Sequence, residues 1–140
     1  MPRTRDRKGR LFTYHGQRSA RYMLKDTCLR CHKSWTQEEA EYQVDAIQNY
    51  IRGKMRKAEY WLGQLIETFI RAKDLGVSEE KLKAIWPYHD RAHILWEWWT
   101  AENSDGFHNP QHARESLAQS INASQEGIKI LEKAIEEKRK

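Results

Sequence analysis

Two cysteines and a histidine stand within five consecutive residues, Cys28-Leu29-Arg30-Cys31-His32. The pattern C-x-x-C-H is the attachment signature of a c-type haem. Two thiols three positions apart can form thioether bonds to the two vinyl groups at one haem edge, and the adjacent imidazole can reach the iron. The motif therefore predicts a covalent haem c held by Cys28 and Cys31, with His32 as the proximal iron ligand.

Other uses of a cysteine pair fit this sequence less well. A thioredoxin-like dithiol would need a βαβ pattern, and a structural zinc site would need a second pair of ligands near the first. His89 and His93 are four residues apart and would share a helix face, but no third zinc ligand stands near them in the sequence. We expect them to be a packed or exposed pair, and a zinc site or a structural dithiol remains the alternative to haem attachment.

A long helix is predicted directly after the motif. Thr36 can cap its start, with Glu39 three residues later as the partner of a capping box, and Gly76 can end it. Between these limits apolar residues recur every three or four positions, which is the spacing of one helix face. These residues are Val44, Ile47, Ile51, Met55, Ala58, Leu62, Leu65, Phe69 and Ala72.

Two further helices are predicted after Gly76. Ser78 is expected to begin a helix over residues 78–102, with a break at Pro87 because proline lacks the amide proton. Asn109 before Pro110 places a capping residue ahead of a favoured first helical position, so a final helix is expected over 110–137. Its inner face would contain Ala113, Leu117, Ile121, Ile128, Leu131 and Ile135.

The segment before the motif shows no sustained period. Residues 1–27 mix charges with Gly9 and Gly16, which predicts an extended arm with a short helix near residues 19–25 and no competing strand. The predicted fold class is all-α, with an extended N-terminal haem-binding arm followed by long antiparallel helices. We divide it into an arm over 1–35 and a helical region over 36–140, within a single partial domain.

Composition limits the classes of function. The 140 residues predict one domain, and 39% hydrophobic residues are enough for a folded core. No apolar run is long enough for a membrane span, and the start MPRTRDRKGR has no apolar segment typical of a secretion signal. The net charge of +5 is concentrated at both ends of the chain, and no nucleic-acid recognition motif accompanies it, so no nucleic-acid partner is expected.

Residue types alone leave the roles of the remaining histidines and of a tryptophan cluster open. His15 lies in the polar arm, and His108 stands in a turn between Gly106 and a helix start, so either could be an iron ligand or a solvated side chain. Trp96, Trp98 and Trp99 place aromatic rings on two faces of one helix. One face could contact a neighbouring helix and the other a porphyrin or second subunit, or all three could belong to an ordinary core.

Three sequence motifs follow one another along the chain: GRLFTYH at residues 9–15, the C-x-x-C-H motif, and residues 93–110, which end in AENSDGFHNP. In this order and spacing, the chain resembles the C-terminal part of the ammonia-forming pentahaem cytochrome c nitrite reductases (cytochrome c552). The resemblance covers nearly the whole chain. It implies a multihaem cytochrome c fold and a role in the six-electron reduction of nitrite to ammonium.

The resemblance also implies roles for individual residues. Cys28 and Cys31 would hold the family's last haem with His32 as proximal ligand, and His15 and His108 would be distal ligands to haems attached upstream. The chain would begin just after the fourth attachment site. The substrate haem, its catalytic residues and the family's calcium site would all lie in a missing N-terminal portion, so no catalytic residue is assigned here and the fragment alone is expected to be inactive.

The expected partners follow from the same resemblance. They are the missing N-terminal portion, a second copy in a homodimer formed through the long helices, and an electron-donor cytochrome or quinol dehydrogenase, in the periplasm. Three alternatives remain: part of a related multihaem oxidoreductase acting on hydroxylamine or another small nitrogen or sulfur oxyanion, a stand-alone monohaem electron carrier, and a cofactor-free helical interaction module.

Overall fold

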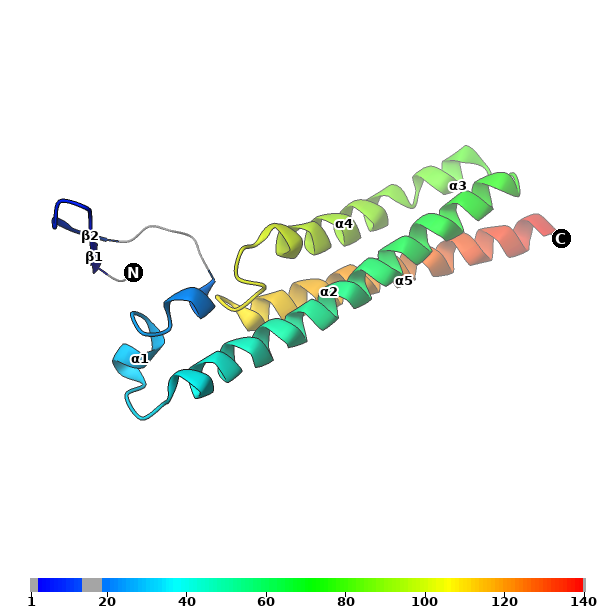
Figure 1. Cartoon of the computed structure of the whole chain (residues 1–140). Helices are drawn as coiled ribbons and strands as arrows, with labels where there is room; N and C mark the ends of the chain where they lie inside the picture. Colours follow the sequence, from blue (N-terminus) through cyan, green and yellow to red (C-terminus); the bar gives the residue numbers. More distant parts are fainter. Residues whose placement is uncertain (1–2, 14–18, 140) are drawn as a thin grey trace.

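The N-terminal arm contains the first short elements of the chain. A computed structural model describes residues 3–13 and 19–139, so His15 lies outside the described residues. Strands β1 (Arg3–Arg5) and β2 (Leu11–Thr13) pair antiparallel, followed by the 3-10 helix η1 (Ala20–Met23) and by α1 (Cys28–Cys31). Figure 1 shows this arm at the end of the molecule where the first long helix begins.

The hairpin corrects the expectation of an arm without strands. Its turn is closed by Asp6, whose Oδ1 accepts hydrogen bonds from the backbone N–H groups of Lys8 (2.8 Å) and Arg10 (2.9 Å). Gly9 supplies the positive φ of +75° that the turn needs. Hydrogen bonds from the backbone and then the guanidinium of Arg10 lower the pKa of the Asp6 carboxyl. The strands are three residues long, which is too short to produce a recognisable alternation.

Helix α2 (Gln37–Asp74) confirms the long helix predicted after the motif. Thr36 and Glu39 form the predicted capping box: the Thr36 side chain accepts from the Glu39 N–H at 3.1 Å, and the Glu39 carboxylate accepts from the Thr36 N–H at 2.7 Å. The helix ends at Asp74, and Gly76 follows with φ +76°, the left-handed conformation expected of a glycine at a helix end.

Helices α3 (Glu79–Lys83) and α4 (Trp86–Ala101) replace the single broken helix expected over 78–102. The interruption lies at Ala84 and Ile85, ahead of the expected position. Pro87 lies in the first turn of α4, where a missing amide proton costs no helical hydrogen bond. The final helix, α5 (Pro110–Arg139), begins as predicted: the Asn109 side chain accepts a hydrogen bond from the His112 N–H at 3.2 Å.

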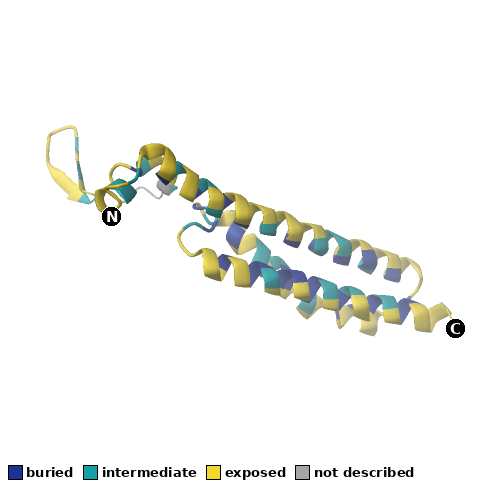
Figure 2. Ribbon diagram, turned by 90° about the horizontal axis from the view of Figure 1, so that it is seen from below, coloured by how far each residue is buried: buried dark blue, intermediate teal, exposed yellow. Residues whose placement is uncertain are grey.

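The long helices pack side by side without a sheet, as the all-α prediction requires. Figure 1 shows α4 running antiparallel to both of its neighbours, so that α2 and α5 run in the same direction. Their inner faces are buried and their outer faces exposed (Figure 2). The predicted inner face of α5 is confirmed for Ala113, Leu117, Ile121, Leu131 and Ile135, whereas Ile128 is only partly buried.

Small residues on α5 allow the other helices to approach closely. Gly127 faces Leu65 of α2, and a Cβ built on this glycine would lie 2.8 Å from the Leu65 Cδ1. The Ser120 hydroxyl, which is fully buried, donates a 2.7 Å hydrogen bond to the Ala92 carbonyl of α4. These contacts bring three helix backbones together where larger side chains would separate them.

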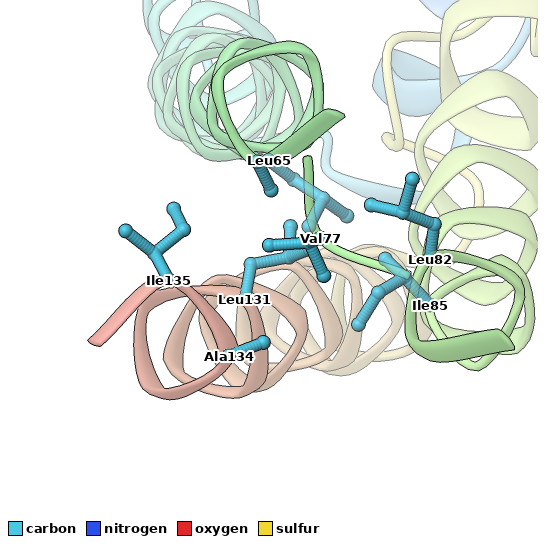
Figure 3. Close-up of a cluster of buried hydrophobic side chains, with 8 residues drawn as sticks. Leu65, Val77, Leu82, Ile85, Leu131, Ala134 and Ile135 are labelled. Carbon is cyan, nitrogen blue, oxygen red and sulfur yellow. The ribbon is translucent and has the colours of Figure 1, made fainter. Parts of the chain in front are cut away.

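A hydrophobic cluster closes the end of the bundle farthest from the arm (Figure 3). Val77, Leu82 and Ile85 from the connection around α3 meet Leu65 of α2 and Leu131 of α5. Burying each large aliphatic side chain contributes about 1.5–3 kcal/mol. Within the part of the chain that the structure describes, no helix is both long and apolar enough to cross a membrane.

Candidate functional site

The C-x-x-C-H motif forms a single helical turn. Cys28 and Cys31 are the first and last residues of α1, and His32 follows as its C-cap, with its N–H donating to the Cys28 carbonyl at 2.9 Å. Residues three positions apart lie on the same side of a helix. The turn therefore brings both thiols to one face and places the imidazole directly beside them.

Hydrophobic contacts fix this turn against the start of α2. Leu24, Ala40 and Val44 form a buried cluster, and Cys28, Leu29, Trp35 and Phe107 pack against it. The Thr27 hydroxyl donates to the Met23 carbonyl at 2.6 Å and lies 3.6 Å from the Cys28 Sγ. One thiol is thus anchored in the protein, while the Cys31 thiol is exposed.

The His32 imidazole is exposed but oriented. Its ring stacks on the Trp35 indole, with centroids 4.0 Å apart and an interplanar angle of 18°. A backbone hydrogen bond from the Trp35 N–H to the His32 carbonyl, at 3.1 Å, holds the two residues in this arrangement. The stacking restricts the ring to few orientations while leaving it accessible to a ligand.

These residues fit a c-type haem. Both cysteines are free thiols, as thioether formation requires, and they share one face of a helical turn. An accessible imidazole stands at the next position, which supplies the nitrogen donor that haem iron takes. Among the residues that the structure describes, no group of three His, Cys, Asp or Glu side chains gathers as metal ligands.

A second candidate segment is the loop between α4 and α5, residues 102–109, which we call the His108 turn. The carboxylate of Glu102 organises it: Oε2 accepts from the Ser104 hydroxyl at 2.7 Å and from the Gly106 N–H at 3.0 Å. The other oxygen, Oε1, lies 3.4 Å from the His108 Nδ1. The His108 N–H donates to the Ser104 hydroxyl oxygen at 3.1 Å, so backbone and ring are both tied to this network.

The Glu102 side chain is partly buried, with 21% of it exposed, whereas the His108 side chain is 60% exposed. Burial raises the pKa of Glu102, but hydrogen bonds from the Ser104 hydroxyl, from backbone N–H groups and from His108 together outweigh it and hold that pKa below its usual value. The network therefore favours the ionised carboxylate, which accepts from every one of these donors.

A buried glutamine connects this turn to the arm. Gln48 of α2 is 2% exposed, and its amide nitrogen donates to the Ser104 carbonyl at 3.0 Å and to the Ser19 hydroxyl at 2.9 Å. Sequence reasoning missed Gln48 because it is polar, although its position, four residues after Val44 and three before Ile51, lies on the apolar face of the helix. It also missed Glu102, for which the only signal was a carboxylate six residues before a turn histidine.

The structure brings some of the predicted site residues together and separates others. Phe107 packs in the same cluster as Cys28, so the haem motif and the His108 turn lie at one end of the bundle. His89 and His93 stack on each other along α4, with ring centroids 5.6 Å apart. They form the expected helix-face pair.

The tryptophans of α4 divide between core and surface. Trp99 is buried and Trp96 is partly buried against two core clusters, whereas Trp98 is 67% exposed. One face of α4 thus packs on neighbouring helices and the other leaves a large aromatic surface uncovered. The contact with neighbouring helices that the sequence offered for one face is therefore present, and the three tryptophans do not all belong to an ordinary core.

Comparison with models of protein families finds one that describes cytochrome c552 and matches residues 1–139. The match extends over both segments described above, the arm with its cysteine-histidine turn and the helices that carry the His108 turn. The chain therefore belongs to the cytochrome c552 family and is a haem protein related to the cytochrome c nitrite reductases.

Proposed function

We propose that this chain supplies the C-terminal part of an ammonia-forming multihaem cytochrome c nitrite reductase, in which it carries one electron-relay haem. The observation that carries the proposal is the helical turn of α1, which places two free thiols on one face beside an accessible imidazole. The family match over residues 1–139 supports the assignment to this class of oxidoreductase.

Each residue of the turn has a separate task in this proposal. The Cys28 and Cys31 sulfurs would form the covalent bonds that keep the cofactor in place, and the His32 imidazole would be the proximal ligand of its iron. Trp35 holds the imidazole ring by stacking at 4.0 Å. When bound, a haem of this kind supplies reversible one-electron transfer between its ferric and ferrous states.

His108 and His15 are proposed as distal ligands to two haems attached elsewhere on the complete polypeptide. The 60% exposure of the His108 side chain supports its part, since a distal ligand must be accessible to a separately attached haem. For His15 the support is the resemblance of GRLFTYH to the family's pattern. The arm, residues 1–35, would thus serve haem binding, and residues 36–140 would serve ligation and assembly.

The helical region is also proposed to form the homodimer contact. Large apolar side chains remain exposed on its outer faces, including Ile66 and Ile70 of α2 and Trp86, Ile94 and Trp98 of α4, each at 43–67% exposure. Uncovered apolar surface of this kind marks interaction sites. The remaining proposed partners are the N-terminal portion of the enzyme and an electron-donor cytochrome or quinol dehydrogenase in the periplasm.

The proposal is tested with the 140-residue chain, exported and matured with haem. We expect one covalent haem and no ammonium from nitrite with a reduced dye as electron donor, because the motifs of a substrate haem do not occur in these residues. A Cys28→Ser/Cys31→Ser double variant, produced in parallel, should contain no covalent haem. Ammonium production by the chain alone would contradict the assignment of its role.

Absorption and paramagnetic resonance spectra of the same sample separate the alternatives. In the family, the distal ligand of this haem comes from the missing segment, so we expect five-coordinate, water-ligated or mixed ligation. A homogeneous low-spin bis-histidine spectrum would instead favour a stand-alone monohaem carrier. A C-x-x-C-K motif in the coding sequence upstream would distinguish a nitrite reductase from a hydroxylamine-type relative.

A further inference from the structure

We infer that Glu102 is the positioning residue for His108: its carboxylate holds the proton of the imidazole on Nδ1 and thereby leaves Nε2 as the free, outward-facing donor. The inference rests on the proposed role of His108 as a distal haem ligand, which it deepens. It concerns residues of this chain alone, and its main test requires no haem.

The two oxygens of the Glu102 carboxylate have different tasks. Oε2 is engaged by the Ser104 hydroxyl and the Gly106 N–H at 2.7 and 3.0 Å, which fixes the carboxylate in the turn. Oε1 is left facing the His108 Nδ1 at 3.4 Å. The Ser104 hydroxyl and the Gly106 N–H therefore hold the carboxylate in place independently of the imidazole that it faces.

The chemistry of the pair determines where the ring proton lies. An ionised carboxylate only accepts hydrogen bonds, so the ring nitrogen that faces it must carry the proton. In a neutral imidazole the second nitrogen is then an acceptor with a free lone pair, as iron ligation requires. Because the two nitrogens point away from each other across the ring, anchoring Nδ1 at this partly buried carboxylate directs Nε2 of the exposed ring toward solvent.

Histidines that ligate metals generally donate their other ring N–H to a carboxylate or carbonyl, which fixes both tautomer and orientation. In the His108 turn, the Glu102 Oε1 stands 3.4 Å from the His108 Nδ1, in position to accept such a hydrogen bond. The backbone supports it a second time, since the His108 N–H donates to the same Ser104 hydroxyl that donates to Glu102. A carboxylate that served only to close the turn would need the two hydrogen bonds that Oε2 accepts from Ser104 and Gly106. It would not need the contact between Oε1 and the His108 ring.

The substitution Glu102→Gln separates these two roles. A glutamine has one carbonyl oxygen, which can replace Oε2 and keep both turn donors, while its NH2 group would take the place of Oε1 and donate to the ring. The His108 Nδ1 must then accept, and the proton moves to Nε2. We therefore expect Glu102→Gln to preserve the fold and reverse the tautomer, whereas Glu102→Ala should release the ring to the tautomer of a solvated histidine.

Nitrogen NMR of the imidazole rings in the full 140-residue chain measures the tautomer directly. At a pH where the rings are neutral, with His108 assigned by the signals lost in His108→Ala, we expect the wild type to show protonated Nδ1 and unprotonated Nε2. Exposed His112 in α5 serves as the internal reference. Protonated Nε2 in the wild type, or a tautomer unchanged by Glu102→Gln in a folded variant, would overturn the inference.

The consequence for ligation is measured with a soluble probe, an N-acetylated ferric haem c octapeptide with one axial histidine and an open sixth position. Loss of a carboxylate partner typically weakens metal binding by about 10–100-fold, and we expect Glu102→Gln to weaken the His108-dependent binding by that factor. Where binding of the probe depends on His108, equal binding by wild type and Glu102→Gln would overturn the inference. If His108→Ala binds the probe as tightly as wild type, the proposed ligand role fails, and the NMR result still decides the role of Glu102.

Discussion

The substitution Gly106→Ala should disrupt the His108 turn. We expect it to do so more than a glycine-to-alanine substitution in either neighbouring helix. Gly106 is buried with φ +78°, a conformation that L-residues with a Cβ rarely adopt. A Cβ at this position would lie 2.8 Å from the Ile51 Cγ2 and 3.1 Å from the Ala113 Cβ. Both neighbours belong to the buried cluster between α2 and α5, so neither can move freely.

The cost can be worked out from these two effects. The left-handed conformation costs a non-glycine residue about 1–2 kcal/mol. Overpacking a well-filled core costs about 1–3 kcal/mol more. Together we expect Gly106→Ala to lower the free energy of unfolding by about 2–5 kcal/mol, which for a chain of this size corresponds to about 4 °C in melting temperature per kcal/mol.

Gly53 of α2 provides the matched control. It is exposed in the middle of a helix, and a Cβ there would meet nothing within 4 Å. Gly53→Ala should therefore stabilise the chain by about 1 kcal/mol through helix propensity alone. Urea unfolding of both variants, followed by circular dichroism, compares them with wild type. A Gly106→Ala variant as stable as wild type would refute the reasoning about this turn.

Three further substitutions test the caps and the buried network, each by urea unfolding. Thr36→Ala should cost about 1 kcal/mol because it removes the capping box, whereas Ser78→Ala should change little, since the Ser78 side chain makes no capping hydrogen bond. Gln48→Leu should cost about 1–3 kcal/mol because it removes the hydrogen bonds from the buried Gln48 amide to the Ser104 carbonyl and to the Ser19 hydroxyl, while Gln43→Leu at an exposed position of α2 should stay within about 0.5 kcal/mol of wild type. Because the folded-state pKa of Glu102 is lowered, its contribution should be complete above its ordinary pKa of about 4.3 and lost as the pH falls through the folded-state value. The stability difference between wild type and Glu102→Gln should therefore narrow from pH 7 to pH 3.5, and a constant difference would contradict the assigned ionisation.

The long helices were predictable because their signals are local and repeated. The three-and-four spacing of α2 extends from Val44 to Ala72, and the Thr36 box and Gly76 mark the ends of the helix independently. The same spacing predicted the inner face of α5. The break before α4 was misplaced because Pro87 can either end a helix or occupy its first turn, and only the packing around Ile85 selects the second.

The site was only partly predictable, for a related reason. The C-x-x-C-H motif is contiguous, so its chemistry can be read from five residues. The partners of the His108 turn are not contiguous: Gln48 reaches it from a position 56 residues before Ser104, and its place on the apolar face of α2 predicts burial but not the group that it bonds. Likewise, the stacking of His32 on Trp35 depends on the backbone turn after α1 and not on residue type.

Covalent attachment of a haem to Cys28 and Cys31 is the basis of the proposed function. Intact-mass spectrometry under denaturing conditions measures this attachment. The chain is exported together with the cytochrome c maturation apparatus, and wild type is compared with the Cys28→Ser/Cys31→Ser variant. We expect a mass increase of one haem in the wild type that survives denaturation and is absent from the double variant. A wild-type chain that folds as described but gains no covalent haem under these conditions would contradict the proposed attachment.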